Sequence, residues 1–196
     1  AINASMPSAT TTNSSGVVGA TNVKVGSMVI TAGSGEAVNI TQLVVGDDGD
    51  TATSDFGDNF QNLTLRNGSA TSTPLATVQG TLSGTAGADY TFSLSPSLTV
   101  AAGAQYVVDL YADILTGAAG YAAAEIGLEF VSVSATGIST SADASYSTVV
   151  NLQNVVIAAS GALTITQNAA TPVAGQLVMG ETGQTVAMLD FAAGSA

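Results

Sequence analysis

The sequence predicts an all-β fold: an Ig-like antiparallel β-sandwich of roughly ten strands, preceded by an extended amino-terminal arm. Stretches in which apolar and polar residues alternate occur along most of the 196 residues, as in strands that bury one face against a second sheet. Residues typical of turns separate these stretches at the spacing of about 8–12 residues found in sandwiches. No segment of eleven residues or more keeps the apolar spacing of an amphipathic helix.

The first half of the chain divides into an arm, an acidic loop and four strands. Residues 1–15 are polar and rich in Ser and Thr, which predicts the arm, and we expect one sandwich domain over residues 16–196. Residues 46–59 form the acidic loop, and Asn67-Gly68 is the strongest hairpin signal in the chain. The strands expected here are residues 23–31, 37–45, 60–66 and 74–82.

The second half contains the clearest alternation. Residues 105–114 place apolar side chains on one face and two Asp residues on the other. Further on, the alternation shifts at Val131 and Val133, which predicts a β-bulge or a bend. Residues 149–158 and 162–167 flank Ala-Ser-Gly and are expected to pair as a hairpin. Residues 96–104 hold a short β-like run and a Gly turn, and the strands expected here are residues 89–94, 105–114, 123–134, 149–158, 162–167, 176–179 and 184–191.

One hairpin pattern occurs twice in the chain. Residues 177–196 repeat the pattern of residues 16–35 at a constant offset of 161 positions, and seven of the twenty residues are identical. Each copy consists of a strand, a Gly turn and the start of a second strand. The identical pairs are Val17/Val178, Gly19/Gly180, Thr21/Thr182, Val25/Val186, Ala32/Ala193, Gly33/Gly194 and Ser34/Ser195.

The sequence leaves three interpretations of this repeat open. The chain can be one period of an array of modules about 161 residues long, together with the first hairpin of the next module. It can also be a subunit whose terminal strand or polar arm completes the sheet of a neighbour, which produces open filaments. In the third, two hairpins of one sandwich share a pattern of Val, Gly and Ser by chance.

Charge and composition exclude several functional classes. Lys24 and Arg66 are the only basic residues against 14 acidic ones, so a nucleic-acid partner is not expected. The absence of Cys and His excludes thiol nucleophiles, zinc fingers and Ser-His-Asp triads. No apolar run approaches the roughly 18 residues of a membrane span, so we expect no membrane insertion. Trp is absent and aromatic residues make up 5% of the chain, so platforms for stacking sugars are scarce and no enzymatic activity is expected.

The acidic loop is the candidate metal site. Ca²⁺ takes six to eight oxygen ligands, largely carboxylates and carbonyls, and Gly residues permit the sharp turns around it. The loop lacks the bidentate Glu of an EF-hand, and a solvated loop without metal is the alternative. If Ca²⁺ binds, the expected ligands are Asp47, Asp48, Asp50, Asp55 and Asp58. A second acidic cluster is expected only if the strands that carry its members are neighbours: Asp109, Asp113, Glu125 and Glu129.

Five Asn residues stand in N-x-S/T sequences that secreted proteins can carry glycosylated. Two of them, Asn39 and Asn62, fall within expected strands. The other three are expected to be exposed and are the glycosylation candidates: Asn3, Asn13 and Asn67.

Residues 91–114, TFSLSPSLTVAAGAQYVVDLYADI, resemble tandem β-sandwich modules of bacterial and archaeal surface proteins, as do residues 25–40, VGSMVITAGSGEAVNI. The resemblance implies a structural or adhesive role outside the cell and supplies no catalytic residues. The expected function is therefore that of a non-enzymatic extracellular subunit of a surface filament or layer, a homopolymer held together by inter-subunit β-strand addition. The alternatives are a Ca²⁺-stiffened module of a tandem-repeat adhesin, which would bind other cells or surfaces, and a carbohydrate-binding module.

Overall fold

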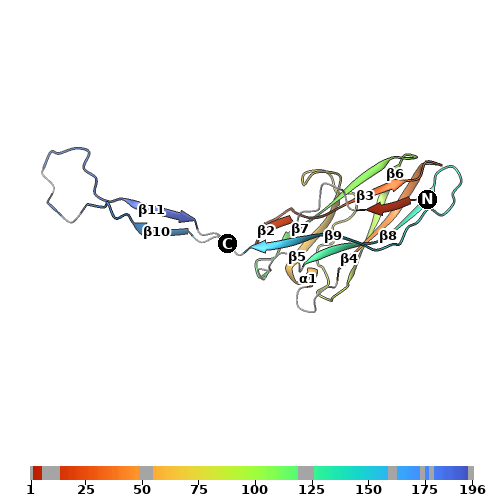
Figure 1. Ribbon diagram of the computed structural model, residues 1–196, viewed down its shortest axis with the longest axis horizontal. Helices are drawn as coiled ribbons and strands as arrows, with labels where there is room; N and C mark the ends of the chain where they lie inside the picture. Colours follow the sequence, from red (N-terminus) through yellow and green to blue (C-terminus); the bar gives the residue numbers. More distant parts are fainter. Residues whose placement is uncertain are drawn as a thin grey trace. The chain divides into compact units, whose positions relative to one another are not determined.

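The computed structural model describes residues 2–5, 14–48, 55–118, 126–158, 163–172, 175–176 and 179–193. These residues form eleven strands and one helical turn, and the chain divides into two units, Ala1–Ala158 and Ala159–Ala196. The all-β prediction is confirmed, and the first unit is a sandwich of two sheets (Figure 1). Within the described ranges, no helix is long and apolar enough to cross a membrane.

Two sheets of four and five strands make up the sandwich. The four-stranded sheet is antiparallel throughout, in the order β1 (Ile2–Ser5), β3 (Val23–Ala32), β7 (Gln105–Ile114) and β5 (Phe60–Arg66). The five-stranded sheet is antiparallel except for the parallel pair β2–β9, in the order β2 (Ser14–Val17), β9 (Val150–Ala158), β8 (Gly127–Gly137), β4 (Val38–Asp47) and β6 (Asp89–Val100).

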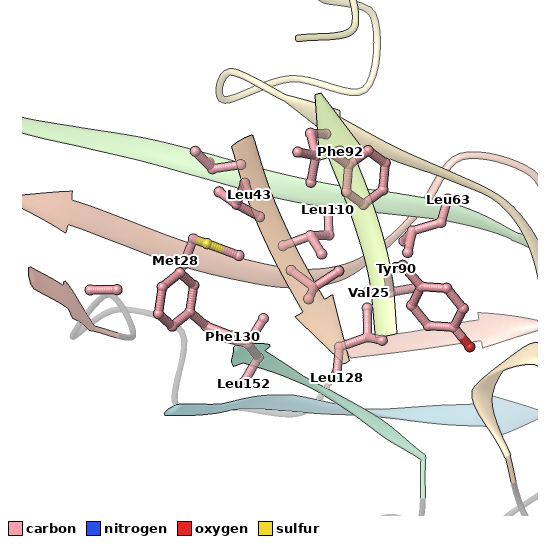
Figure 2. Packing of buried hydrophobic residues seen from close by; sticks show 14 of the residues in the cluster. Val25, Met28, Leu43, Leu63, Tyr90, Phe92, Leu110, Leu128, Phe130 and Leu152 are labelled. Atoms are coloured by element: carbon pink, nitrogen blue, oxygen red, sulfur yellow. The ribbon is translucent and has the colours of Figure 1, made fainter. Parts of the chain in front are cut away.

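The core lies between the sheets because both present their apolar positions inward. Figure 2 shows side chains of both sheets meeting there, among them Met28 and Leu110 from one sheet and Leu43 and Phe130 from the other. The helical turn α1 (Phe56–Asn59) adds Phe56, which stacks on Phe60 with ring centroids 4.3 Å apart. The apolar faces predicted by alternation are therefore the faces that fold the domain.

Several sequence predictions are confirmed in detail. The strands β5 and β7 have the predicted bounds. The predicted bulge in β8 is also present: Val44 pairs with Ser132 and Val45 with Phe130, so the pairing skips Val131. The extra residue reverses the inward-facing set, so that Val133 is buried after the bulge as Phe130 is before it.

Two expected segments differ from the structure. The described residues of the expected arm, 2–5 and 14–15, are paired: β1 pairs with β3 and β2 pairs with β9. The expected strand over residues 74–82 is not one: this stretch makes only isolated bridges, between Leu63 and Gln79 and between Ala76 and Leu94. Few apolar residues of this stretch face inward. It therefore crosses from β5 towards β6 without pairing continuously with a strand of either sheet.

The expected hairpin of residues 149–158 and 162–167 is also wrong. The strand β9 pairs with β8 and β2, whereas β10 (Leu163–Gln167) pairs with β11 (Leu189–Ala193) in a sheet of its own. The expected single domain over residues 16–196 is accordingly divided after Ala158. The physical reason is that the edges of β9 are already occupied, so the apolar residues of β10 find their partners further along the chain.

The helical turn α1 packs against backbone, and this gives a stability prediction. A Cβ atom placed on Gly57 would lie 2.0 Å from the carbonyl oxygen of Ser83. This is a steric clash, and the backbone would have to move to remove it. We expect Gly57→Ala to lower the free energy of unfolding by about 1–3 kcal/mol, as overpacking does. The matched control is Gly35→Ala, where a Cβ would meet no atom within 4 Å; urea denaturation should show no change beyond about 0.5 kcal/mol there. Equal effects of the two substitutions would contradict the packing described.

Candidate functional site

The predicted calcium ligands lie at the two ends of the acidic loop. Asp47 is the last residue of β4 and is buried, and its Oδ2 accepts a hydrogen bond of 3.0 Å from the backbone N–H of Phe56. This bond ties the end of β4 to the start of α1. Asp48 follows β4, Asp55 precedes α1 and Asp58 lies within it, whereas Asp50 falls outside the described residues.

The described carboxylates do not form a metal site. In the described ranges, no group of three or more His, Cys, Asp or Glu side chains is placed to hold a metal ion. The hydrogen bond from the backbone N–H of Phe56 to Asp47 fixes the backbone at the close of the loop, which is a structural role. Calcium binding by this loop, which includes Asp50, stays a prediction.

The second acidic cluster expected from the sequence does not form. Asp109 and Asp113 lie on β7 of the four-stranded sheet, whereas Glu129 lies on β8 of the five-stranded sheet. Glu125 falls outside the described residues. Strands of two different sheets do not share an outward face, so these carboxylates are not neighbours.

Glu129 instead belongs to a row of acids across the end of the five-stranded sheet. In the strand register, Gly46 of β4 lies opposite Glu129 of β8 on one side and Asp89 of β6 on the other. A Cβ atom on Gly46 would lie 3.1 Å from Asp89 Oδ1 and 3.3 Å from Glu129 Oε1. Both carboxylates therefore lie close to this glycine, on the same face of the sheet. Burial raises the pKa of Glu129, and the charges of Asp48, Asp89 and Asp47 raise it further.

The raised pKa of Glu129 predicts a pH-dependent stability. Because the folded state favours the protonated carboxyl, the stabilising contribution is present below the pKa of the unfolded chain and is lost as pH rises through the higher folded pKa. We expect Glu129→Gln to raise the melting temperature at pH 7 and to leave it unchanged at pH 3, as measured by circular dichroism. A melting temperature that falls at pH 7 would contradict repulsion between these carboxylates.

Both basic residues of the chain lie next to β7. Lys24 of β3 forms an ion pair with Asp109, with Nζ 2.7 Å from Oδ1. The hydroxyl of Ser27 donates a hydrogen bond of 2.6 Å to the same oxygen. Arg66 of β5 lies opposite Asp109 in the strand register, and its guanidinium donates to the carbonyl oxygen of Ser72. Sequence reasoning missed this buried carboxylate because Asp109 alternates with apolar residues as an outward-facing residue would.

The glycosylation candidates stay predictions. Asn3 lies on β1 with its side chain exposed, and Asn67 is exposed in the turn after β5. Asn13 falls outside the described residues. Of the sequons placed in strands, Asn39 lies in β4 and Asn62 in β5, and the side-chain amide of Asn62 donates to Asp113 Oδ2 over 2.8 Å.

Within the described residues of the second unit, one face of the β10–β11 hairpin is apolar and exposed. In the β10–β11 ladder, Leu163 lies opposite Ala193, Ile165 opposite Phe191 and Gln167 opposite Leu189. Because strand side chains alternate, these residues share one face, and the Thr and Asp residues between them share the other. Ile165 is 54% exposed and Phe191 is 66% exposed. A two-stranded sheet cannot bury such a face by itself, so this hairpin is the candidate interaction site.

Comparison with known proteins gives little further information. No protein-family model matches the chain, and no curated protein matches it. Among solved structures, it is similar to a family 123 glycoside hydrolase from Clostridium perfringens, with a TM-score of 0.32 and 12% identity. The match covers 80% of this chain and 28% of that enzyme, so the chain spans little more than a quarter of its length. A likeness at this level carries no argument about fold or activity.

Proposed function

We propose that this chain is a non-enzymatic structural protein of the cell exterior, in which β-sandwiches join end to end into a filament or layer. The joining element is the hairpin β10–β11, which adds its strands to the next sandwich. The observation that carries the proposal is the exposed apolar face of this hairpin, built from Leu163, Ile165, Leu189 and Phe191. Strand addition gives many backbone hydrogen bonds and apolar contacts at once, which suits permanent assemblies.

The geometry of the sandwich supports an extended assembly. The amino end of β1 and the carboxyl end of β9 lie at opposite ends of the sandwich (Figure 1). The register agrees: Ile2 pairs with Ala32 at the end of β3, whereas Ala158 pairs with Val17, a few residues before β3 begins. Sandwiches that follow one another in the chain therefore extend in one direction, as a structural array requires.

The chemistry of the surface supports an external, non-catalytic role. The net charge of −12 keeps the protein soluble and repels nucleic acids and anionic membranes. The buried carboxylate Asp109 is paired with Lys24, and the buried Asp47 bonds to backbone, so the two serve the fold rather than a reaction. The Ser- and Thr-rich surface and the resemblance to surface-protein modules point the same way.

Immunogold electron microscopy of cells that make the protein tests this proposal. Antibodies raised against residues 1–158 should label filaments or a layer at the cell exterior, and shearing the cells should release the labelled material. Label confined to the cytoplasm would overturn the proposal. A screen of aryl-glycoside substrates with the purified chain provides the second arm, and turnover of any of them would overturn the non-enzymatic part.

A further inference from the structure

The pairing of β10 with β11 reproduces the pairing of β1 with β3. The two ladders share their register when 161 is added to every residue number, although no residue of β1 is identical to its counterpart in β10. The corresponding pairs are Ile2–Ala32 and Leu163–Ala193, Asn3–Thr31 and Thr164–Ala192, Ala4–Ile30 and Ile165–Phe191, and Ser5–Val29 and Thr166–Asp190. The chain therefore repeats the pairing of these strands as well as part of their sequence.

The turn before the second strand is repeated as well. Gly19 has a φ of 80° and its counterpart Gly180 has a φ of 92°. Asn22 has a φ of 54° and its counterpart Gly183 has a φ of 76°. Three of these four residues are glycines, which adopt positive φ readily, and Asn22 is the exception. The shared spacing and offset of the two positions therefore extend the repeat to the backbone conformation of this turn.

The two hairpins differ in what covers them. Ala4 and Ile30 are 6% and 0% exposed in the sandwich, and their counterparts are the exposed Ile165 and Phe191. In the sandwich, the second sheet covers this face, and β7 pairs with β3 along its whole length. The strand β11 has only β10 as a neighbour and is correspondingly shorter, five residues against ten in β3.

We infer that β10 and β11 are the first hairpin of a second sandwich, and that their partner is a sandwich body with the topology of residues 36–158, continuous with the hairpin in one polypeptide. This inference deepens the proposed function and rests on it for the end-to-end joining of sandwiches. The body supplies a strand equivalent to β7 for the free edge of β11 and a second sheet for the apolar face.

The hairpin cannot take the place of β1 and β3 in its own sandwich. Ala158 lies near the start of β3, whereas Ile2 lies at its end, about 30 Å away for ten residues at roughly 3.3 Å each. The five steps from Ala158 to Leu163 span at most about 18 Å. The second hairpin therefore does not substitute for β1 and β3 in the first sandwich.

A second copy of this chain fits the hairpin poorly. Residues 1–196 contain two hairpins of this type and one body, and in this body the place of the hairpin is already taken by β1 and β3. The chemistry also differs. Lys24 and Ser27, which bind the buried carboxylate of Asp109, correspond to Thr185 and Met188 in the second hairpin. Docked on this body, the second hairpin would leave Asp109 buried without its ion-pair partner Lys24, which is strongly unfavourable. The body that fits has a neutral residue at that position.

The test is a fusion in which residues 36–158 are repeated directly after Ala196, the counterpart of Gly35. We expect a second cooperative unfolding transition, and amide exchange in residues 163–167 and 189–193 slower than in the unfused chain by about 100-fold, because the hairpin then opens only with a folded sandwich. In the appended copy alone, Asp109→Asn should raise the second transition by roughly 6–12 °C, because it removes a buried charge that lacks its ion-pair partner, whereas in the first sandwich it should lower the first transition.

Matched variants and two adverse results make the test decisive. In the fusion, Ile165→Lys on the apolar face should abolish the second transition, and Thr164→Lys on the opposite face should leave it in place. An appended body that stays unfolded, with and without Asp109→Asn, would overturn the inference. So would self-association of the unfused chain that slows exchange in the hairpin, because a second copy would then be the occupant. Neither result touches the cell-surface labelling that tests the proposed function.

Discussion

Replacing Ile30 by alanine should lower the free energy of unfolding of the sandwich by about 2–5 kcal/mol, whereas Phe191→Ala at the equivalent position should leave it within about 0.5 kcal/mol. Ile30 is fully buried between the two sheets, so truncation loses apolar burial and leaves a cavity. Phe191 occupies the same place in the β10–β11 register but is exposed. The repeat thus provides a natural pair of positions with the same strand geometry and opposite burial.

Tyrosine fluorescence during urea denaturation measures this difference cleanly. All five tyrosines lie between residues 90 and 146, within the first unit, so the signal reports only on the sandwich. Ile165→Ala serves as a second exposed control on β10. A loss of stability from Phe191→Ala similar to that from Ile30→Ala would show that the hairpin face is covered in the isolated chain and would contradict the exposure described.

Replacing Lys24 by methionine should lower the free energy of unfolding by roughly 3 kcal/mol, the lower end of the range for breaking a buried ion pair. Asp109 is buried, and the ion pair with Lys24 is its charge compensation in the four-stranded sheet. The cost falls at the lower end because the Lys24 side chain is 35% exposed, so water partly screens the pair. Methionine keeps the length of the aliphatic stem and removes only the charge.

The double variant Lys24→Met with Asp109→Asn separates charge from packing. Because asparagine has nearly the same shape as aspartate without its charge, the double variant should regain much of the stability lost in Lys24→Met. Urea denaturation of the four proteins of this cycle gives the coupling free energy directly. A coupling near zero would mean that water reaches Asp109 once the lysine is gone.

The strands that sequence predicted best are those whose inward and outward faces differ most. In β7, the alternation predicts the bounds, although it does not reveal that Asp109 is buried, and in β5 the following Asn-Gly marks the end. The bulge at Val131 was predicted because the alternation itself shifts there. In each case, the information lies within ten or so consecutive residues, which is the range over which periodicity can be read.

The parts that sequence did not predict depend on pairing between distant segments. The residues of β1, Ile-Asn-Ala-Ser, are too few to show a pattern, and they form a strand because β3 offers an open edge. The partner of β10 is β11, more than 20 residues away, and local turn residues suggested β9 instead. The ion pair of Lys24 and Asp109 joins residues 85 positions apart. Among the candidate metal ligands, Asp47 accepts a hydrogen bond from the backbone N–H of Phe56, and the residues around Asp47 in the sequence do not predict this bond.

The arrangement of chain ends in the sandwich also determines how it responds to tension. A pull applied at Ile2 and Ala158 acts along the strand axes, because the amino end of β1 and the carboxyl end of β9 lie at opposite ends of the sandwich (Figure 1). In this geometry the hydrogen bonds between β1 and β3, and between β2 and β9, are loaded in shear and must break together. Peeling them one at a time would need far less force. A string of such domains would therefore resist stretching up to a threshold and then yield one domain at a time.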